Sequence, residues 1–186
     1  MERVITELKN YIPTFDVQVP PTTGFYAFYV NNNSFDTSKL SGIKEYDCIY
    51  IGIAKDETLS KRIKEAHFKD FGKSTFRRSI GAILLNQLEL EPIMRGINPT
   101  KSNISNFKFN HISEERISHF IFNNLSIAIC SCDNTQFNLK ETEKILIKRF
   151  NYPAFNLEHA NNHNEYYNAI KDARKSCRNR IIQNLE

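Results

Sequence analysis

The hydrophobic residues of this chain fall into three short runs that are typical of buried strands. Residues 24–30, 47–53 and 125–132 are rich in aromatic and β-branched side chains, and polar residues or prolines separate them. Short apolar runs bounded by turn-forming residues favour strands over helices. We therefore predict a three-stranded sheet in which the first two strands pair antiparallel.

Elsewhere in the chain, apolar residues recur at helical spacing. We predict helices over residues 2–11, 58–69, 76–88, 113–123, 138–150 and 164–183. Residues 91–111 are polar and contain two prolines, so irregular structure is expected there. The combination predicts the α+β class, with a small mixed or antiparallel three-stranded sheet flanked by helices and with helical extensions at both ends.

Length and charge narrow the class of protein. A chain of 186 residues has room for one domain with short appendages. Its apolar runs are all shorter than the roughly 20 residues that span a bilayer. The first 13 residues carry charges and lack the apolar core of a signal peptide. We expect a cytoplasmic protein without a membrane segment.

Basic residues gather in two places, and the net charge is +4. One cluster is Lys73, Arg77 and Arg78, and the other lies between residues 171 and 180. Clustered cations fit a polyanionic partner. A solvated helix face explains each cluster equally well when it is taken alone.

Five short motifs, in order along the chain, resemble those of the GIY-YIG nucleases. Residues 24–26 read Gly-Phe-Tyr and residues 50–52 read Tyr-Ile-Gly, on the first two predicted strands. Arg62 follows on a predicted helix, and Glu143 lies on a later helix that leads to a proline and Asn156. Phe25 departs mildly from the aliphatic residue that is usual there. The resemblance implies a nuclease domain over residues 22–158.

With the nuclease domain placed at residues 22–158, the chain is expected to divide into a domain with one insert and two extensions. Residues 70–124 form an enlarged helical insert. Residues 1–21 are an N-terminal helical extension, and residues 159–186 are a basic C-terminal helix. The implied activity is metal-dependent endonucleolytic hydrolysis of DNA phosphodiester bonds.

Glu143 is the expected ligand of one Mg²⁺ or Mn²⁺ ion. Leu139, Leu146 and Phe150 lie at −4, +3 and +7 from it, so Glu143 interrupts the apolar stripe of its own helix. An unpaired carboxylate on such a face is costly, and it should be paired or metal-bound. The alternative is a carboxylate at the edge of the stripe with its tip in water.

Arg62 and His67 are the expected phosphate and proton-transfer residues of the helix that follows the second strand. An arginine offers fork-like donors to the scissile phosphate, and a histidine can assist proton transfer. In an ideal α-helix the two side chains diverge by roughly 140°. They share one point only if the helix end distorts, so Arg62 is the stronger candidate. Either residue alone is more often an ordinary surface residue.

Tyr26 and Tyr50 are alternative general bases. A tyrosine has a pKa near 10 and is a poor base at neutral pH unless a nearby cation favours the phenolate. A metal ion and Arg62 would supply such cations. The resemblance implies that both tyrosines face the site, and it leaves open which one accepts the proton. The alternative is that both are core aromatics of their strands.

Nucleic-acid contacts are expected from residues outside the catalytic set. Lys55 and Asn156 are candidates, although Asn156 equally well fixes its own loop. The other candidates come from the two basic clusters: Lys73, Arg77, Arg78, Arg174, Lys175 and Arg178. DNA is the expected partner, and RNA is not excluded. A non-catalytic nucleic-acid-binding or adaptor protein on the same fold and an RNA-directed nuclease or toxin are the competing hypotheses. Oligomeric state and target stay open.

Overall fold

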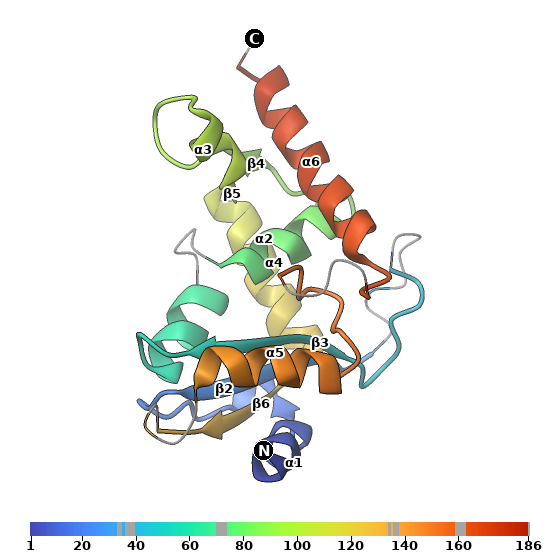
Figure 1. Cartoon of the computed structure of the whole chain (residues 1–186). Helices are drawn as coiled ribbons and strands as arrows, with labels where there is room; N and C mark the ends of the chain where they lie inside the picture. The colour runs from blue at the N-terminus through green and yellow to red at the C-terminus, as the bar shows by residue number, and fades with distance from the viewer. Residues whose placement is uncertain are drawn as a thin grey trace.

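A four-stranded antiparallel sheet forms the base of the molecule (Figure 1). The computed structural model of the chain describes residues 1–32, 35, 40–69, 74–133, 135, 138–158 and 163–185. The sheet order is β1-β6-β2-β3, and its strands are β1 (Ile12–Pro13), β2 (Gly24–Val30), β3 (Cys48–Ala54) and β6 (Leu125–Ser131). The α+β prediction is confirmed. The number of strands rises from three to four because β1, too short for any sequence period, pairs with residues 126–127.

Within the described residues, six α-helices surround the sheet, together with one 3₁₀ segment and one π-helical segment. The helices are α1 (Glu2–Lys9), α2 (Thr75–Ile83), α3 (Lys101–Ser105), α4 (His111–Asn124), α5 (Leu139–Arg149) and α6 (Tyr167–Gln183). The 3₁₀ segment is η1 (Thr14–Asp16), and the π-helical segment is η2 (Lys61–His67). Residues 91–111 are more regular than predicted, because β4 (Pro92–Ile93) pairs with β5 (Lys108–Phe109) and α3 lies between them.

Helices cover both faces of the sheet. Successive strand residues point to opposite faces, so β2 sends Phe25 and Ala27 to one side and Tyr26 and Phe28 to the other. The first face packs against α1 and α5, and the second against η2, α2, α4 and α6. All seven residues of β2 are therefore buried. In Figure 1, α1 and α5 lie close to the sheet, whereas α6 extends away from it beside α2.

The edge of β3 is closed by the loop that follows α5. The backbone N–H of Phe155 donates to the carbonyl of Ile49 at 2.8 Å. The side-chain amide of Asn156 accepts from the N–H of Ile51 and donates to its carbonyl, both at 2.8 Å. These bonds occupy backbone groups that an edge strand would otherwise expose. They also hold residues 153–158 beside Tyr50.

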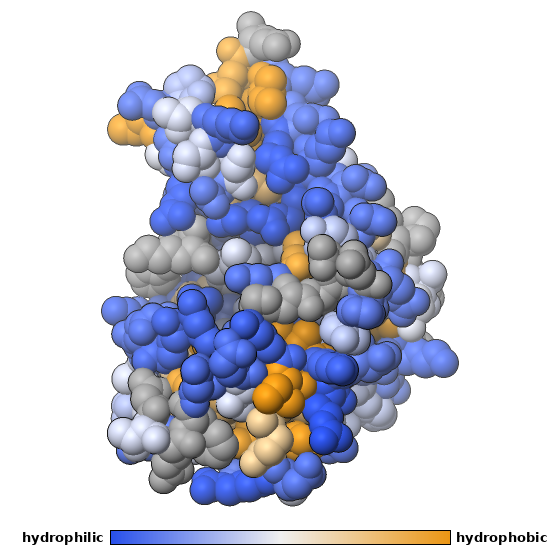
Figure 2. All heavy atoms as spheres, in the orientation of Figure 1, coloured by the Kyte–Doolittle hydropathy of each residue, from blue (hydrophilic) through white to orange (hydrophobic). Residues whose placement is uncertain are grey.

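The molecular surface is mainly hydrophilic on the face seen in Figure 2. Large exposed apolar side chains such as Phe15, Ile97 and Ile112 come from separate elements. Among the residues that the structure describes, no helix combines the length and the apolar character needed to cross a membrane.

Candidate active site

The hydroxyl of Tyr26 is the centre of a buried polar network. It lies 2.6 Å from Nε2 of His67, and it accepts a longer hydrogen bond of 3.4 Å from Nε of Arg62. Tyr26 and His67 are both fully buried. Arg62 also pairs with Glu57 at 3.4 Å, which holds its guanidinium at the edge of the network. The structure therefore brings three of the predicted catalytic residues together.

The π-helical turn η2 explains how Arg62 and His67 meet at one hydroxyl. The N–H of Phe68 donates to the carbonyl of Ile63, an i→i+5 bond of 3.0 Å. In this geometry residues five apart in sequence lie about one turn apart. The divergence of roughly 140° expected for an α-helix is therefore wrong for this segment. From the sequence, Arg62 and His67 were expected to share a contact only if the helix end distorts. The π-helical turn is that distortion.

His67 is held on its other side by Ser74. Nδ1 of His67 lies 2.8 Å from Oγ of Ser74, and that oxygen also accepts from the N–H of Arg77 as the N-cap of α2. Burial lowers the pKa of His67 well below its ordinary value, and Arg62 and Arg77 lower it further. The imidazole is therefore neutral at neutral pH. Ser74 was missed in the sequence, although a serine just before a predicted helix is an N-cap signal.

Tyr50 lies beside Tyr26 on the same face of the sheet. Their ring centroids are 6.1 Å apart. Burial raises the pKa of both phenols, while Arg62 acts in the opposite direction on each. Gly52 is the cross-strand partner of Tyr26, and a Cβ at that position would collide with the Tyr26 hydroxyl. The glycine of the second motif thus makes room for the tyrosine of the first.

Glu143 and Tyr50 line a cavity of about 220 Å³ next to this network. Asn156, Glu158 and Arg174 contribute to its walls. Glu143 is partly buried, and the pKa of its carboxyl is raised to about 7. Burial is the main cause and the charge of Glu158 adds to it, whereas Arg62 acts in the opposite direction. Glu158 was not a sequence candidate because no period or motif singled it out.

The donor set of this cavity fits a hard cation. Among the described residues Glu143 has no hydrogen-bond or ion-pair partner, and the charge of Glu158 opposes its ionisation. A divalent ion would relieve both penalties. The part of the chain that is described contains no group of three His, Cys, Asp or Glu side chains able to hold a metal. One or two carboxylates suit Mg²⁺, which keeps waters and takes phosphate oxygens.

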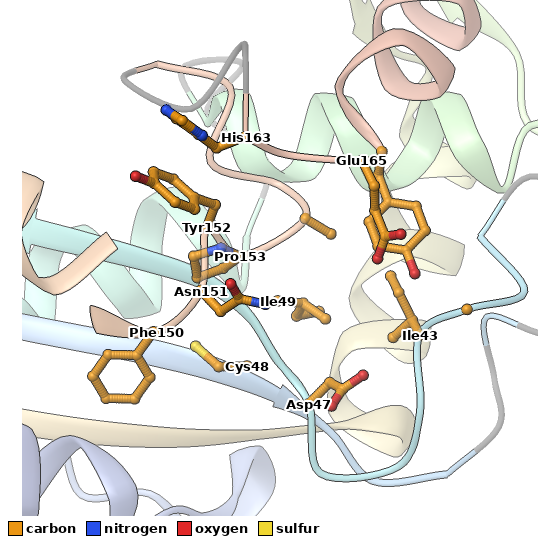
Figure 3. Close-up of a pocket in the computed structure, with 13 residues that line it drawn as sticks. Ile43, Asp47, Cys48, Ile49, Phe150, Asn151, Tyr152, Pro153, His163 and Glu165 are labelled. Carbon is orange, nitrogen blue, oxygen red and sulfur yellow. The ribbon is translucent and has the colours of Figure 1, made fainter. Parts of the chain in front are cut away.

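A larger cavity of about 390 Å³ lies on the other side of the loop after α5 (Figure 3). Its side chains include Tyr152, stacked on His163, and the carboxylates Asp47 and Glu165. The described residues of its lining include no lysine or arginine and none of the predicted catalytic residues. This lining does not favour a phosphate, so the smaller cavity is the better candidate site.

Two predicted nucleic-acid contacts are corrected by burial. Arg77 donates to Glu114 with a shortest distance of 2.6 Å, and Arg78 donates to the carbonyl of Phe107 at 2.9 Å. Both guanidinium groups are buried. They link α2 to Glu114 of α4 and to the backbone of Phe107. Arg77 and Arg78 are therefore not part of an exposed basic cluster. Lys73, the third member, lies outside the described residues.

The other predicted contacts differ in their surroundings. Asn156 is buried and uses its amide on the β3 backbone, which supports the loop-fixing alternative, and its contact with nucleic acid stays a prediction. Lys55 forms an ion pair with Asp56 at 2.9 Å near the surface. On α6, Lys175 is exposed and Arg178 is partly buried. Arg174 alone of this cluster lines the cavity of Glu143.

Comparison with protein families gives a match to the GIY-YIG catalytic domain over residues 24–176. The match covers more than half of the chain. The chain belongs to the GIY-YIG family. It therefore carries a domain of nuclease type that acts on nucleic acid, and nucleases of this family generally depend on a metal ion. Comparison with curated proteins and with solved structures gives no significant match.

The region matched to the GIY-YIG domain includes three strands of the sheet (β2, β3 and β6), η2, α5 and the first part of α6. Tyr26, Tyr50, Arg62 and Glu143 all lie within it. The division of the chain at residues 21 and 158 stays a prediction.

Proposed function

We propose that this protein is an endonuclease that hydrolyses DNA phosphodiester bonds with a single divalent metal ion. The observation that carries the proposal is that Tyr50 and Glu143 line one cavity in a GIY-YIG domain while Tyr26 and Arg62 lie directly beside Tyr50. Phosphodiester hydrolysis needs an activated water, stabilisation of charge on phosphorus-bound oxygens and help for the leaving oxygen. The site offers one group for each of these tasks.

Glu143 would hold Mg²⁺ or Mn²⁺, with Glu158 across the same cavity as a second carboxylate. The ion supplies Lewis-acid stabilisation to the phosphate oxygens when it is bound. Arg62 donates from its guanidinium to the charge that develops on the phosphate in the transition state. Its ion pair with Glu57 and its contact with Tyr26 fix the direction of that fork.

The two tyrosines and His67 handle the proton of the attacking water. Tyr50 is the member of the pair that lines the cavity, so the water reaches its hydroxyl first. Tyr26 lies behind it, within hydrogen-bond distance of His67. With the imidazole proton on Nδ1 and directed to Ser74, Nε2 is free to accept the proton of Tyr26. We propose that Tyr50 takes a proton from the water as it passes its own hydroxyl proton to Tyr26, and that Tyr26 in turn passes its proton to Nε2 of His67.

DNA backbone contacts outside the cavity are assigned to Lys55, Lys175 and Arg178. These side chains are exposed or partly exposed, and those of α6 belong to its basic face. Contacts of this kind set affinity and its dependence on salt, and they carry no base sequence information.

The test is cleavage of supercoiled plasmid with Mg²⁺ or Mn²⁺ against EDTA. Glu143→Gln should abolish metal-dependent nicking. Glu141→Gln, on the exposed face of the same helix and paired with Lys144, is the matched control and should retain it. Equal activity of the two variants would remove Glu143 as the metal ligand.

A failure of the wild-type protein to cut DNA is informative in two ways. Cleavage of RNA under the same conditions would favour the RNA-directed nuclease. Binding of DNA without cleavage of any nucleic acid would favour the adaptor hypothesis.

A further inference from the structure

Arg174 has an environment unlike that of any other cation considered for this site. Its Nε atom is buried and has no hydrogen-bond partner among the described residues. Those residues also form no ion pair with Arg174. Burial lowers the pKa of its guanidinium, and the charge of Arg178 lowers it further. A buried guanidinium nitrogen without an acceptor is costly, so the placement of the partly buried Arg174 side chain favours an anion that the described residues do not supply.

The helix α6 aims this side chain at the catalytic cavity. Ile170, Ala173 and Cys177 face the core, which fixes the rotation of α6. Arg174 then lies on the flank toward the cavity that also holds Glu143 and Tyr50. In Figure 1 the first turns of α6 lie near the end of α5, in agreement with this shared lining.

The cavity has its two kinds of charge on different elements. Glu143 on α5 and Glu158 in the following loop form an acidic side suited to a cation. Arg174 on α6 forms a basic side, and Thr75 and Ser79 of α2 add hydroxyls near it. A phosphodiester backbone next to a metal ion needs this combination, because consecutive phosphates must each be balanced. Arg62 contacts the hydroxyl of Tyr26 and does not itself line this cavity.

We propose that Arg174 binds a phosphate of the substrate backbone beside the scissile bond, so that α6 forms a wall of the active site. This inference rests on the proposed nuclease function. It gives Arg174 a specific phosphate contact, whereas the other basic residues of the C-terminal segment attract nucleic acid only through their summed charge. Arg174 is a positioning residue for the strand, and the groups that act on the reacting atoms are Arg62, the tyrosines and Glu143.

The experiment measures binding and cleavage for a matched pair of variants. Arg174→Gln removes the charge and the fork inside the cavity. Arg180→Gln makes the same change on the same helix, at an exposed position outside this cavity. Binding is measured by fluorescence anisotropy with a short fluorescein-labelled duplex of random sequence in EDTA over a range of salt, in a Glu143→Gln background. Cleavage of plasmid is measured in the native background.

Arg174→Gln should weaken binding about tenfold or more, the value of a lost charge-assisted hydrogen bond. The slope of log K against log salt should fall by about 0.9, as for one lost phosphate contact. Arg180→Gln should change binding less than threefold. Arg174→Lys keeps the charge and should restore most of the salt slope, whereas cleavage recovers less because the fork is lost.

Equal effects of Arg174→Gln and Arg180→Gln would overturn the inference, because a diffuse field then explains both. Wild-type cleavage that is unchanged in Arg174→Gln would overturn it and leave the nuclease function standing. Weaker binding by Arg174→Gln without cleavage by wild type would support the phosphate contact and remove the nuclease. A protein that binds neither DNA nor RNA loses both proposals. Circular dichroism and thermal unfolding establish that each variant is folded.

Discussion

Polar groups around Tyr26 and polar groups around Glu143 are satisfied in different ways. Tyr26, His67 and Ser74 form a dry chain in which each group has a protein partner at 2.6–2.8 Å. Glu143 and Arg174 share a cavity in which the described residues leave Nε of Arg174 and the carboxylate of Glu143 without hydrogen bonds. The first region fixes protonation states in advance, and the second leaves its charges for ligands. In the proposed mechanism, preorganised proton transfer and ligand-dependent charge balance thus lie side by side.

Among variants that keep the proposed metal ligand, the largest loss of cleavage should come from removing a hydroxyl on the proton path. Tyr26→Phe keeps the buried ring but leaves Nε2 of His67 without a partner. Cleavage should fall about 10²–10⁴-fold, the usual range for lost acid–base catalysis. Tyr50→Phe should have a comparable effect on cleavage. Single-turnover rates with saturating protein measure both.

The two tyrosine variants should differ in stability, which separates the dry region from the cavity. Tyr26→Phe leaves a buried acceptor unsatisfied and should lose about 1–3 kcal/mol in urea unfolding. Tyr50→Phe, at the cavity wall, should lose less. Tyr46→Phe, on a side chain that is 58% exposed, is the control for both assays. Equal stability losses at Tyr26 and Tyr50 would contradict the distinction between the two regions.

A smaller effect is expected from Arg62→Lys at the border of the two regions. Lysine keeps the charge but loses the planar fork that reaches Tyr26 and Glu57. Cleavage should fall roughly 10–100-fold, in line with the loss of a charge-assisted pair of donors. Binding of the duplex in EDTA should change little. A variant that cleaves as fast as wild type would assign Arg62 to structure alone.

Glu143 should make the stability of the metal-free protein depend on pH. The carboxyl has a pKa of about 7 in the folded chain against an ordinary value of 4.5. Between these values the folded state keeps the proton and the unfolded state releases it, so stability falls as pH rises and the loss is complete above about pH 7. The cost of ionisation at pH 8 is on the order of 2 kcal/mol after allowance for partial exposure.

Glu143→Gln should therefore be more stable than wild type at pH 8 and nearly equal to it at pH 5 in EDTA. Added Mg²⁺ should stabilise the wild type at pH 8 and leave the variant unchanged. Urea unfolding at the two pH values, with and without the metal, measures this. A wild-type curve that is flat from pH 5 to pH 8 would show that the carboxyl of Glu143 is solvated.

Sequence patterns predicted the frame of this site better than its contacts. The three long strands and most helices follow from apolar period, because both faces of β2 and one face of α5 must be buried. Arg77 and Arg78 looked like a surface cluster because the sequence does not show that Glu114 and the carbonyl of Phe107 receive them. The shared contact of Arg62 and His67 depends on a π-helical turn, and no spacing of apolar residues in the sequence predicts that turn. Glu158 and Ser74 become visible only when distant segments meet.

The smallest effect should come from Ser74→Ala, at the far end of the dry chain. The variant removes the oxygen that caps α2 and the group that orients Nδ1 of His67. Loss of the cap should cost about 1 kcal/mol of stability. Without Ser74 the imidazole is free to place its proton on Nε2, where it no longer accepts from Tyr26, so cleavage should fall severalfold. Thr100→Ala, which removes the N-cap of α3 away from the site, is the matched control and should cost stability without affecting cleavage. If both variants cleave at the wild-type rate, His67 does not depend on Ser74 for its tautomer, and the dry chain ends at the imidazole.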